Sequence, residues 1–183
     1  MFEPYIQACV ITPTYAHLEA AYLDYGARSD TSPCKRGVAN QCAVRMSIAL
    51  YRAGVGLEGF PDRARVHRGN GNCLTGGVPH VLGAEELANF LATALGEPRR
   101  FRQAPRSRGC AHVFAEITGQ TGILYFNNCF TRAGDAVARG DHIDLFNGTQ
   151  YFNQVLNPSA GGDETTGGSL FGRADSIRFW PLS

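Results

Sequence analysis

Three residues of this chain could together carry out nucleophilic chemistry: Cys42, His142 and Asn153. A cysteine thiolate attacks a carbonyl carbon, and an imidazole moves protons to and from the reacting groups. An amide side chain can hold the imidazole in one tautomer. The set therefore indicates acyl transfer or amide hydrolysis, provided that the fold brings the three side chains together.

A predicted β-hairpin places two of these residues side by side. The segments His142–Phe146 and Thr149–Val155 flank Asn147-Gly148, the dipeptide typical of a two-residue hairpin turn. Counting outward from such a turn pairs His142 with Asn153, and directly opposed residues share a face of the sheet. We therefore expect their side chains to lie within hydrogen-bonding reach.

Cys42 falls near the start of a predicted helix over residues 40–53, with Asn40 as the expected N-cap and Gly54 as the stop. The helix dipole and the first backbone N–H groups would lower the pKa of a thiol there and could donate to an oxyanion. A structural role is also open, because Cys42 shares a helical face with three apolar residues, Met46, Ala49 and Ala53.

Alternation along the strand puts His142, Asp144 and Phe146 on one face and the aliphatic Ile143 and Leu145 on the other. The aliphatic face is the natural core side. We therefore expect His142 to face a cleft or another element.

The other predicted elements give an α+β domain. Helical periodicity marks residues 15–25 and 84–95, and apolar runs predict strands over 112–117, 123–126 and 176–181. Helices packed on a later antiparallel sheet are the expected architecture.

Composition narrows the functional class. The 183 residues, 44% of them hydrophobic, fit a single domain over residues 1–183, and a net charge of +1 argues against nucleic acid as a partner. No conventional signal peptide or membrane-spanning stretch is visible, so no membrane partner is expected.

The six cysteines and five histidines lack metal-ligand spacing, so we expect neither a metal nor a cofactor. Cys34 could form a disulfide in an oxidising compartment.

Two segments resemble motifs of the type VI secretion amidase effectors of family 4. Asn40–Ser47 is similar to the family's Cys-Ala/Pro-x-Arg-x-Ser segment, and Gly140–Gly148 to its Gly-His-hydrophobic-x-Leu-Trp-Asn-Gly segment. Leu87–Pro98, Gly119–Phe126 and Phe179–Pro181 resemble the family's middle helix and two of its strands.

The resemblance implies a papain-like, NlpC-like cysteine peptidase fold and an antibacterial effector. Such an enzyme hydrolyses the amide between D-glutamate and meso-diaminopimelate in peptidoglycan stem peptides without a cofactor. It would be made in the cytoplasm, exported by the type VI apparatus without a signal peptide, and active in the periplasm of a recipient bacterium. A cognate immunity protein would protect the producer.

Carried over by position, Cys42 would be the nucleophile and His142 the general acid and base. The third member would be Asn153, where many relatives have aspartate; an amide can orient the imidazole but supplies no charge. Asp144, on the same strand face as His142, is the runner-up for this role. Arg45 and Ser47 match the motif and are assigned to packing or hydrogen bonding near the site.

Two other functional classes fit the same residues. One is a papain-like protease or acyltransferase that acts on a protein substrate. The other is a non-enzymatic cell-wall-binding module in which Cys42 is structural.

Overall fold

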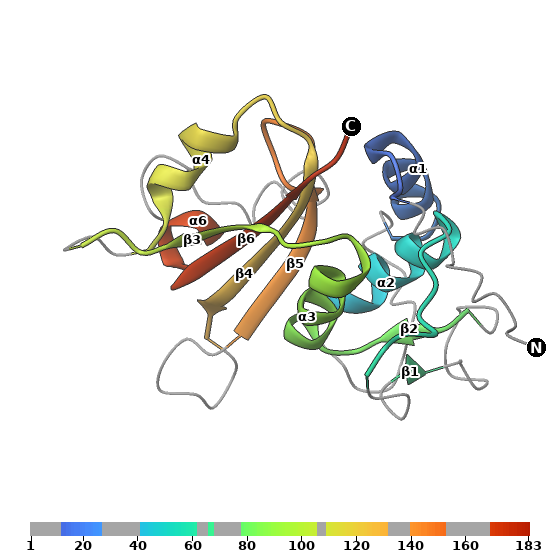
Figure 1. Cartoon of the computed structure of the whole chain (residues 1–183). Coiled ribbons are helices and arrows are strands. Elements are labelled where there is room, and N and C mark those ends of the chain that lie inside the picture. Colours follow the sequence, from blue (N-terminus) through green and yellow to red (C-terminus); the bar gives the residue numbers. More distant parts are fainter. Residues whose placement is uncertain are drawn as a thin grey trace, which may run out of the picture.

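The computed structural model describes residues 12–26, 41–61, 66–67, 78–105, 109–131, 140–152 and 169–183 of the chain (Figure 1). The helices are α1 (Tyr15–Gly26), α2 (Cys42–Arg52), α3 (Ala84–Ala94), α4 (Ala111–Ile117) and α6 (Leu170–Arg173). The strands are β1 (Val66–His67), β2 (His80–Val81), β3 (Arg99–Arg102), β4 (Gly122–Phe130), β5 (Gly140–Phe146) and β6 (Ser176–Pro181).

A four-stranded antiparallel sheet in the order β3-β6-β4-β5 organises the fold, and β1 pairs with β2 in a small separate ribbon. The expected α+β class is confirmed. Strands β4, β5 and β6 cover the predicted apolar runs, whereas β3 was not predicted. Among the described strands β5 ends the sheet order, so one of its edges is open to the helices beside it, apart from a bridge from Phe146 to Tyr151.

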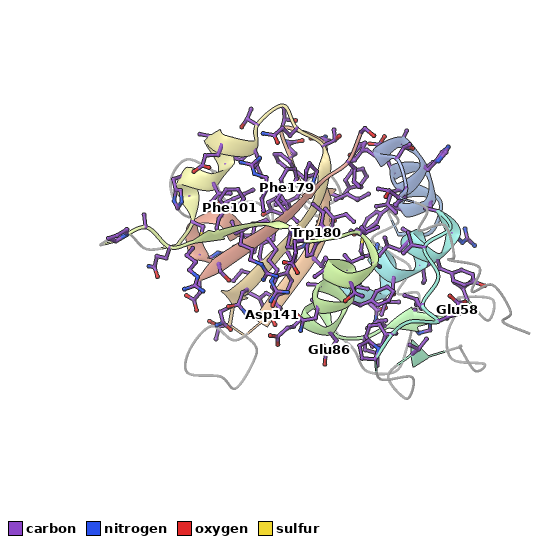
Figure 2. The ribbon with its side chains drawn as sticks, in the orientation of Figure 1. Glu58, Glu86, Phe101, Asp141, Phe179 and Trp180 are labelled. Atoms are coloured by element: carbon purple, nitrogen blue, oxygen red, sulfur yellow. The ribbon has the colours of Figure 1, made fainter. Side chains whose placement is uncertain are left out.

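Both faces of the sheet are buried. Helices α1, α2 and α3 cover one face and α4 and α6 the other, as Figure 1 shows. The first core includes Ile123, Tyr125, Ile143, Leu145 and Trp180; the second includes Leu124, Phe126, Phe146, Ile177 and Phe179. Figure 2 shows Phe179 toward the α4 side and Trp180 toward α3. The predicted alternation along β5 is therefore correct. The face that carries His142 packs against other elements in a second core, which was one of its two expected surroundings.

Helix α2 begins at Cys42, with Gln41 at the N-cap and no side-chain cap hydrogen bond. The predicted cap, Asn40, lies outside the described residues. The predicted stop is confirmed: Gly54 has a φ of 89°. Its N–H donates to the Tyr51 carbonyl and that of Val55 to the Leu50 carbonyl, at 3.2 and 2.9 Å. These two bonds close the helix as a Schellman motif.

Helices α1 and α3 match their predicted ranges closely. Gly96, with a φ of 91°, follows α3, and its carbonyl accepts a 3.0 Å hydrogen bond from Trp180 Nε1 on β6. The backbone N–H of Tyr15 donates to the Ser183 carbonyl at 2.9 Å, which ties the start of α1 to the end of β6. These contacts fix the helical layer against the sheet.

The strand predicted over residues 112–117 is wrong, because this segment is helix α4. Its two fully buried residues, Val113 and Ile117, lie four positions apart, while His112 is exposed. That spacing fits one face of a helix. Phe114 packs edge-on against Phe171 of α6, with ring centroids 5.5 Å apart, so the helix covers the second core.

The predicted two-residue hairpin is also wrong. The turn spans residues 147–150, and Phe146 bridges to Tyr151 rather than to Thr149. Asn147 Oδ1 accepts from the backbone N–H groups of Thr149 and Gln150 at 3.0 and 2.8 Å, which stabilises the wider turn. Phe152 already has helical backbone, so the expected strand does not form over its described part, and residues 153–155 lie outside the described ranges.

No helix in the described ranges is long and apolar enough to cross a membrane.

Ser47 ties α2 to the β-ribbon. Its fully buried hydroxyl donates to the Val44 carbonyl at 3.1 Å and accepts from the Val81 N–H at 2.9 Å. Hydrogen bonding was one of the roles predicted for this motif residue, but its partners lie in α2 and β2 rather than among the candidate catalytic residues.

We expect Ser47→Ala to lower the free energy of unfolding by about 1–3 kcal/mol, because it leaves the buried Val81 N–H without its acceptor. Chemical denaturation measures this loss. The matched control is Thr118→Ala: its hydroxyl also donates to a backbone carbonyl, at 2.7 Å, but is exposed. Water replaces that bond, so the control should change stability by less than about 0.5 kcal/mol. Equal losses in the two variants would contradict the role of burial.

Candidate active site

Four side chains from three elements meet at the open edge of β5. His142 and Asp144 come from β5, Cys42 from the first position of α2, and Tyr22 from α1. Helix α2 packs against both α1 and β5, which brings its N-terminus to this edge. All four residues are at most 7% exposed.

Asp144 is the centre of the hydrogen-bond network. Its side chain is fully buried, and its Oδ2 lies 3.2 Å from His142 Nε2. Its Oδ1 accepts from the Tyr22 hydroxyl and from the Leu145 N–H, each at 2.9 Å. Both oxygens of this buried carboxylate are therefore engaged by donors.

A β-bulge lies next to His142 in the sheet. Phe126 pairs with His142, but the register shifts between Phe126 and Phe130. Asn128 within this stretch has a φ of 50°, and its N–H donates to Asp141 Oδ1 at 2.9 Å. Bulges change the direction of side chains, and this one lies one residue from the imidazole.

The His142 ring is held between aromatic side chains, with its centroid 6.3 Å from that of Phe126 and 6.2 Å from that of Tyr151. Burial alone would lower the pKa of His142. The charge of Cys42, the hydrogen bonds to Asp144 and Cys42, and the charge of Asp144 outweigh it and raise the pKa from 6.5 to about 10. The raised pKa favours the protonated imidazole at neutral pH.

Cys42 has surroundings that fit both of the roles that its sequence position left open. It is 7% exposed and belongs to the first hydrophobic core, yet its side chain also hydrogen-bonds to His142. Since Asp144 occupies Nε2, Nδ1 is the nitrogen left for the sulfur. A thiolate beside an imidazolium is the arrangement that makes cysteine a nucleophile.

The structure therefore brings together Cys42, His142 and Asp144. Asn153 lies outside the described residues, and the register that was to place it opposite His142 does not form. Tyr22 was predicted only as part of the helix over residues 15–25. The signal available for it was general: a buried tyrosine hydroxyl needs a hydrogen-bond partner.

The other described cysteines differ from Cys42 in their surroundings. Cys110 and Cys129 are fully buried in the second core, and neither forms a disulfide. Burial, with a smaller contribution from Asp175, raises the pKa of Cys110 to about 11; burial also raises that of Cys129. Both remain neutral thiols at physiological pH. The remaining cysteines, Cys9, Cys34 and Cys73, lie outside the described residues, as does the glycine-rich stretch 69–77.

Within the described ranges, no three His, Cys, Asp or Glu side chains are placed to hold a metal ion. Asp144 instead faces His142 Nε2 at 3.2 Å and the Tyr22 hydroxyl at 2.9 Å. Contacts of this kind hold or transfer protons. His80 is buried, with Nδ1 3.0 Å from the Val78 carbonyl oxygen, and His17 is exposed on α1.

Comparison with known families gives one match. A family described as "Type VI secretion system (T6SS), amidase effector protein 4", or Tae4, matches residues 38–180. The matched range contains Cys42, His142 and Asp144. No protein of curated function matches the sequence.

Solved structures of Tae4 effectors share the fold. The Tae4–Tai4 effector–immunity complex from Enterobacter cloacae aligns with a TM-score of 0.61 at 16% identity, covering 94% of this chain and 100% of that chain. Tae4 from Enterobacter cloacae alone gives 0.59 at 18%, covering 94% and 98%. The selenomethionine Tae4–Tai4 system from Salmonella typhimurium gives 0.60 at 16%, covering 94% and 100%. The expected papain-like, NlpC-like fold is confirmed.

We expect the pKa of His142 to fall below about 10 in Asp144→Asn, which removes one of the groups that raise it. Cys42→Ala should lower it further, because the charge of Cys42 is the largest raising cause. Titration of the imidazole ¹⁵N resonances measures both shifts. Unchanged titration in the two variants would contradict the assignment of His142 as the shared partner.

The same shift predicts how stability changes with pH. The folded-state pKa of His142 lies above its ordinary value, so the protonated imidazole contributes stability that is complete below pH 6.5 and is lost as the pH rises through about 10. The unfolding free energy of the wild-type chain should therefore fall over this window, and should fall less in Asp144→Asn.

Proposed function

Because the chain belongs to the Tae4 family of type VI secretion system amidase effectors, we propose that Cys42, His142 and Asp144 hydrolyse the amide between D-glutamate and meso-diaminopimelate in peptidoglycan stem peptides. Membership of the family makes the chain an antibacterial amidase effector that is secreted by the type VI apparatus and acts on peptidoglycan. One observation carries the choice of residues: His142 lies between a cysteine at a helix start and a buried carboxylate.

In the proposed reaction, the Cys42 thiolate attacks the carbonyl carbon of the D-glutamyl amide to give a tetrahedral intermediate. Collapse of this intermediate breaks the C–N bond, and the His142 imidazolium gives its proton to the departing diaminopimelate amine. The product is a thioester on Cys42 and a neutral imidazole. His142 then takes a proton from water, and the hydroxide adds to the thioester. Collapse of this second intermediate breaks the C–S bond, releases the D-glutamyl carboxylic acid and restores the thiolate–imidazolium pair; the free acid then loses its proton to solvent.

The start of α2 supports this assignment. Cys42 is the first helical residue, so the first N–H groups of the helix lie beside its sulfur. The positive end of the helix dipole stabilises the thiolate, and these N–H groups are oriented to donate to an oxyanion formed next to the sulfur.

Asp144 is preferred over Asn153 as the partner of His142. An imidazolium has two N–H groups; Nε2 faces Asp144 Oδ2 at 3.2 Å, and the other ring nitrogen is left for Cys42. A carboxylate also stabilises the positive charge on the ring, which an amide does not. The family resemblance predicts the third catalytic residue at Asn153. The variants described below distinguish Asp144 from Asn153 as the partner of His142.

The cellular setting follows from the same proposal. The enzyme is made in the cytoplasm and acts in the periplasm of a recipient bacterium, where peptidoglycan is exposed to it. The Tae4 effectors of Salmonella typhimurium and Enterobacter cloacae are found in complex with the immunity protein Tai4. A cognate immunity protein of the same kind is proposed to protect the producer of this effector.

We expect Cys42→Ala to abolish hydrolysis of purified sacculi, with a fall in kcat on the order of 10⁴-fold or more, because it removes the nucleophile. Mass analysis of the wild-type digest should show fragments that end at D-glutamate and fragments that begin at diaminopimelate. Cys110→Ala is the matched control, since its neutral thiol lies in the second core. This variant should retain wild-type activity.

Three results would overturn parts of the proposal. Intact stem peptides after digestion would favour a protein-directed protease or a binding module. Cleavage at a different bond would refute the bond assignment alone. Full activity of Cys42→Ala would refute the nucleophile.

A second comparison identifies the partner of His142. Asp144→Asn should lower kcat on the order of 10²-fold or more, because it removes the charge that stabilises the imidazolium. Asn153→Ala should change kcat by less than about tenfold, equivalent to less than about 1.4 kcal/mol in the barrier. Initial rates on sacculus fragments measure both effects. The reverse order would assign the role to Asn153.

A further inference from the structure

Tyr22 connects helix α1 to the proposed catalytic group. Its side chain is 3% exposed, and its hydroxyl donates to Asp144 Oδ1 at 2.9 Å, a contact between residues 122 positions apart. Neither the family motifs nor the proposed mechanism gives this residue a part. The hydroxyl lies one carboxylate away from the imidazole.

The contact fixes the orientation of the Asp144 carboxylate. Oδ1 receives two hydrogen bonds, from the Tyr22 hydroxyl on α1 and from the Leu145 N–H on β5. With Oδ1 held from two directions, Oδ2 is directed at His142 Nε2. A carboxylate held only by its own strand would keep rotational freedom about its terminal torsion, which is broad for aspartate.

Tyr22 remains a donor over the working pH range. Burial, the charge of Asp144 and the hydrogen bond to it, and the charge of Cys42 raise its pKa well above the ordinary value of 10.0, while the charge of Arg45 lowers it. The charged groups that act on the hydroxyl therefore come from α2 and β5, and their net effect keeps the proton on Tyr22.

We propose that Tyr22 is a positioning residue of the amidase: its hydroxyl holds the Asp144 carboxylate in the orientation that aligns His142 with Cys42. The inference rests on the proposed function of these three residues. In this proposal Tyr22 acts through its hydrogen bond to Asp144.

The chain offers a conservative variant and a matched control. The Tyr22 ring packs edge-on against Phe152, with centroids 5.3 Å apart, and Tyr22→Phe keeps this packing while removing the hydroxyl. Tyr15 lies on the same helix, and its hydroxyl donates to Glu19 at 3.2 Å. Tyr15→Phe therefore removes a tyrosine hydroxyl from α1 without breaking a hydrogen bond to Asp144.

We expect Tyr22→Phe to lower kcat by about tenfold to a hundredfold with KM changed by less than about twofold, since the loss affects alignment rather than substrate binding. Tyr15→Phe should retain wild-type kcat and KM. Both variants are compared with the wild-type chain in thermal unfolding, so that a loss of folded protein is recognised directly.

A spectroscopic readout tests the inference without relying on activity. The Nε2–H proton of His142 reports its hydrogen bond to Asp144, and in Tyr22→Phe it should move upfield and exchange faster with water. It should be unchanged in Tyr15→Phe. A purely structural role for Tyr22 would leave this proton where it is in the wild-type protein.

A double-mutant cycle tests whether Tyr22 acts through Asp144. The kcat of Tyr22→Phe/Asp144→Asn should equal that of Asp144→Asn alone, because the hydroxyl then has no carboxylate to orient. If the losses of kcat in the two single variants multiply in the double variant, Tyr22 does not act through Asp144. A Tyr22→Phe variant with wild-type kcat and an unshifted Nε2–H proton would also refute the proposal. If the wild-type chain itself leaves sacculi uncut, the proposed function fails, while the proton measurement still decides whether Tyr22 holds the Asp144–His142 contact.

Discussion

The burial of one carboxylate governs how the elements around the candidate site are arranged. Asp144 has no solvent exposure, and an ionised carboxylate is tolerated in such a place only with donors and a counter-charge. Helix α1 supplies a hydroxyl, β5 a backbone N–H, and His142 a protonated ring. The interaction with Cys42, the first residue of α2, is the largest of the causes that raise the pKa of that ring.

The position of β5 at the edge of the sheet determines where this hydrogen-bond network can form. Because helices cover both faces, the side chains of His142 and Asp144 lie over a core that contains Leu124 and Phe126, their partners on β4. The open edge of β5 is the place where a residue from the other helical layer reaches them. Exclusion of water at this edge strengthens the electrostatic interactions of His142 with Asp144 and Cys42, because the local dielectric constant is low. The same two-sided packing that stabilises the sheet thus supports the electrostatics of the site.

Local sequence patterns predicted most of the helical layer and the central strands. They did not predict contacts between residues that are far apart in the sequence. The spacing of apolar residues located α1, α2 and α3, and Gly54 marked the end of α2. The short segment of α4 was misread because a few apolar residues fit a strand or a helix equally well. The Asn147-Gly148 dipeptide correctly predicted a turn, but the turn is longer than the two residues expected. Asn147 Oδ1 accepts hydrogen bonds from the backbone N–H groups of Thr149 and Gln150, which stabilises the longer turn. Cys42 and His142 were found from residue type and position, whereas the role of Tyr22 depends on tertiary packing that periodicity does not encode.

The order of the site's residues along the chain has a consequence for how the site assembles. Tyr22 and Cys42 precede β4, whereas His142 and Asp144 lie on β5, which follows it. A nascent chain that ends before β5 therefore holds the Cys42 thiol without His142 and Asp144, and the contact between Tyr22 and Asp144, 122 positions apart, must form afterwards. Fragments truncated ahead of β5 consequently lack two of the three residues to which the proposed reaction assigns catalysis.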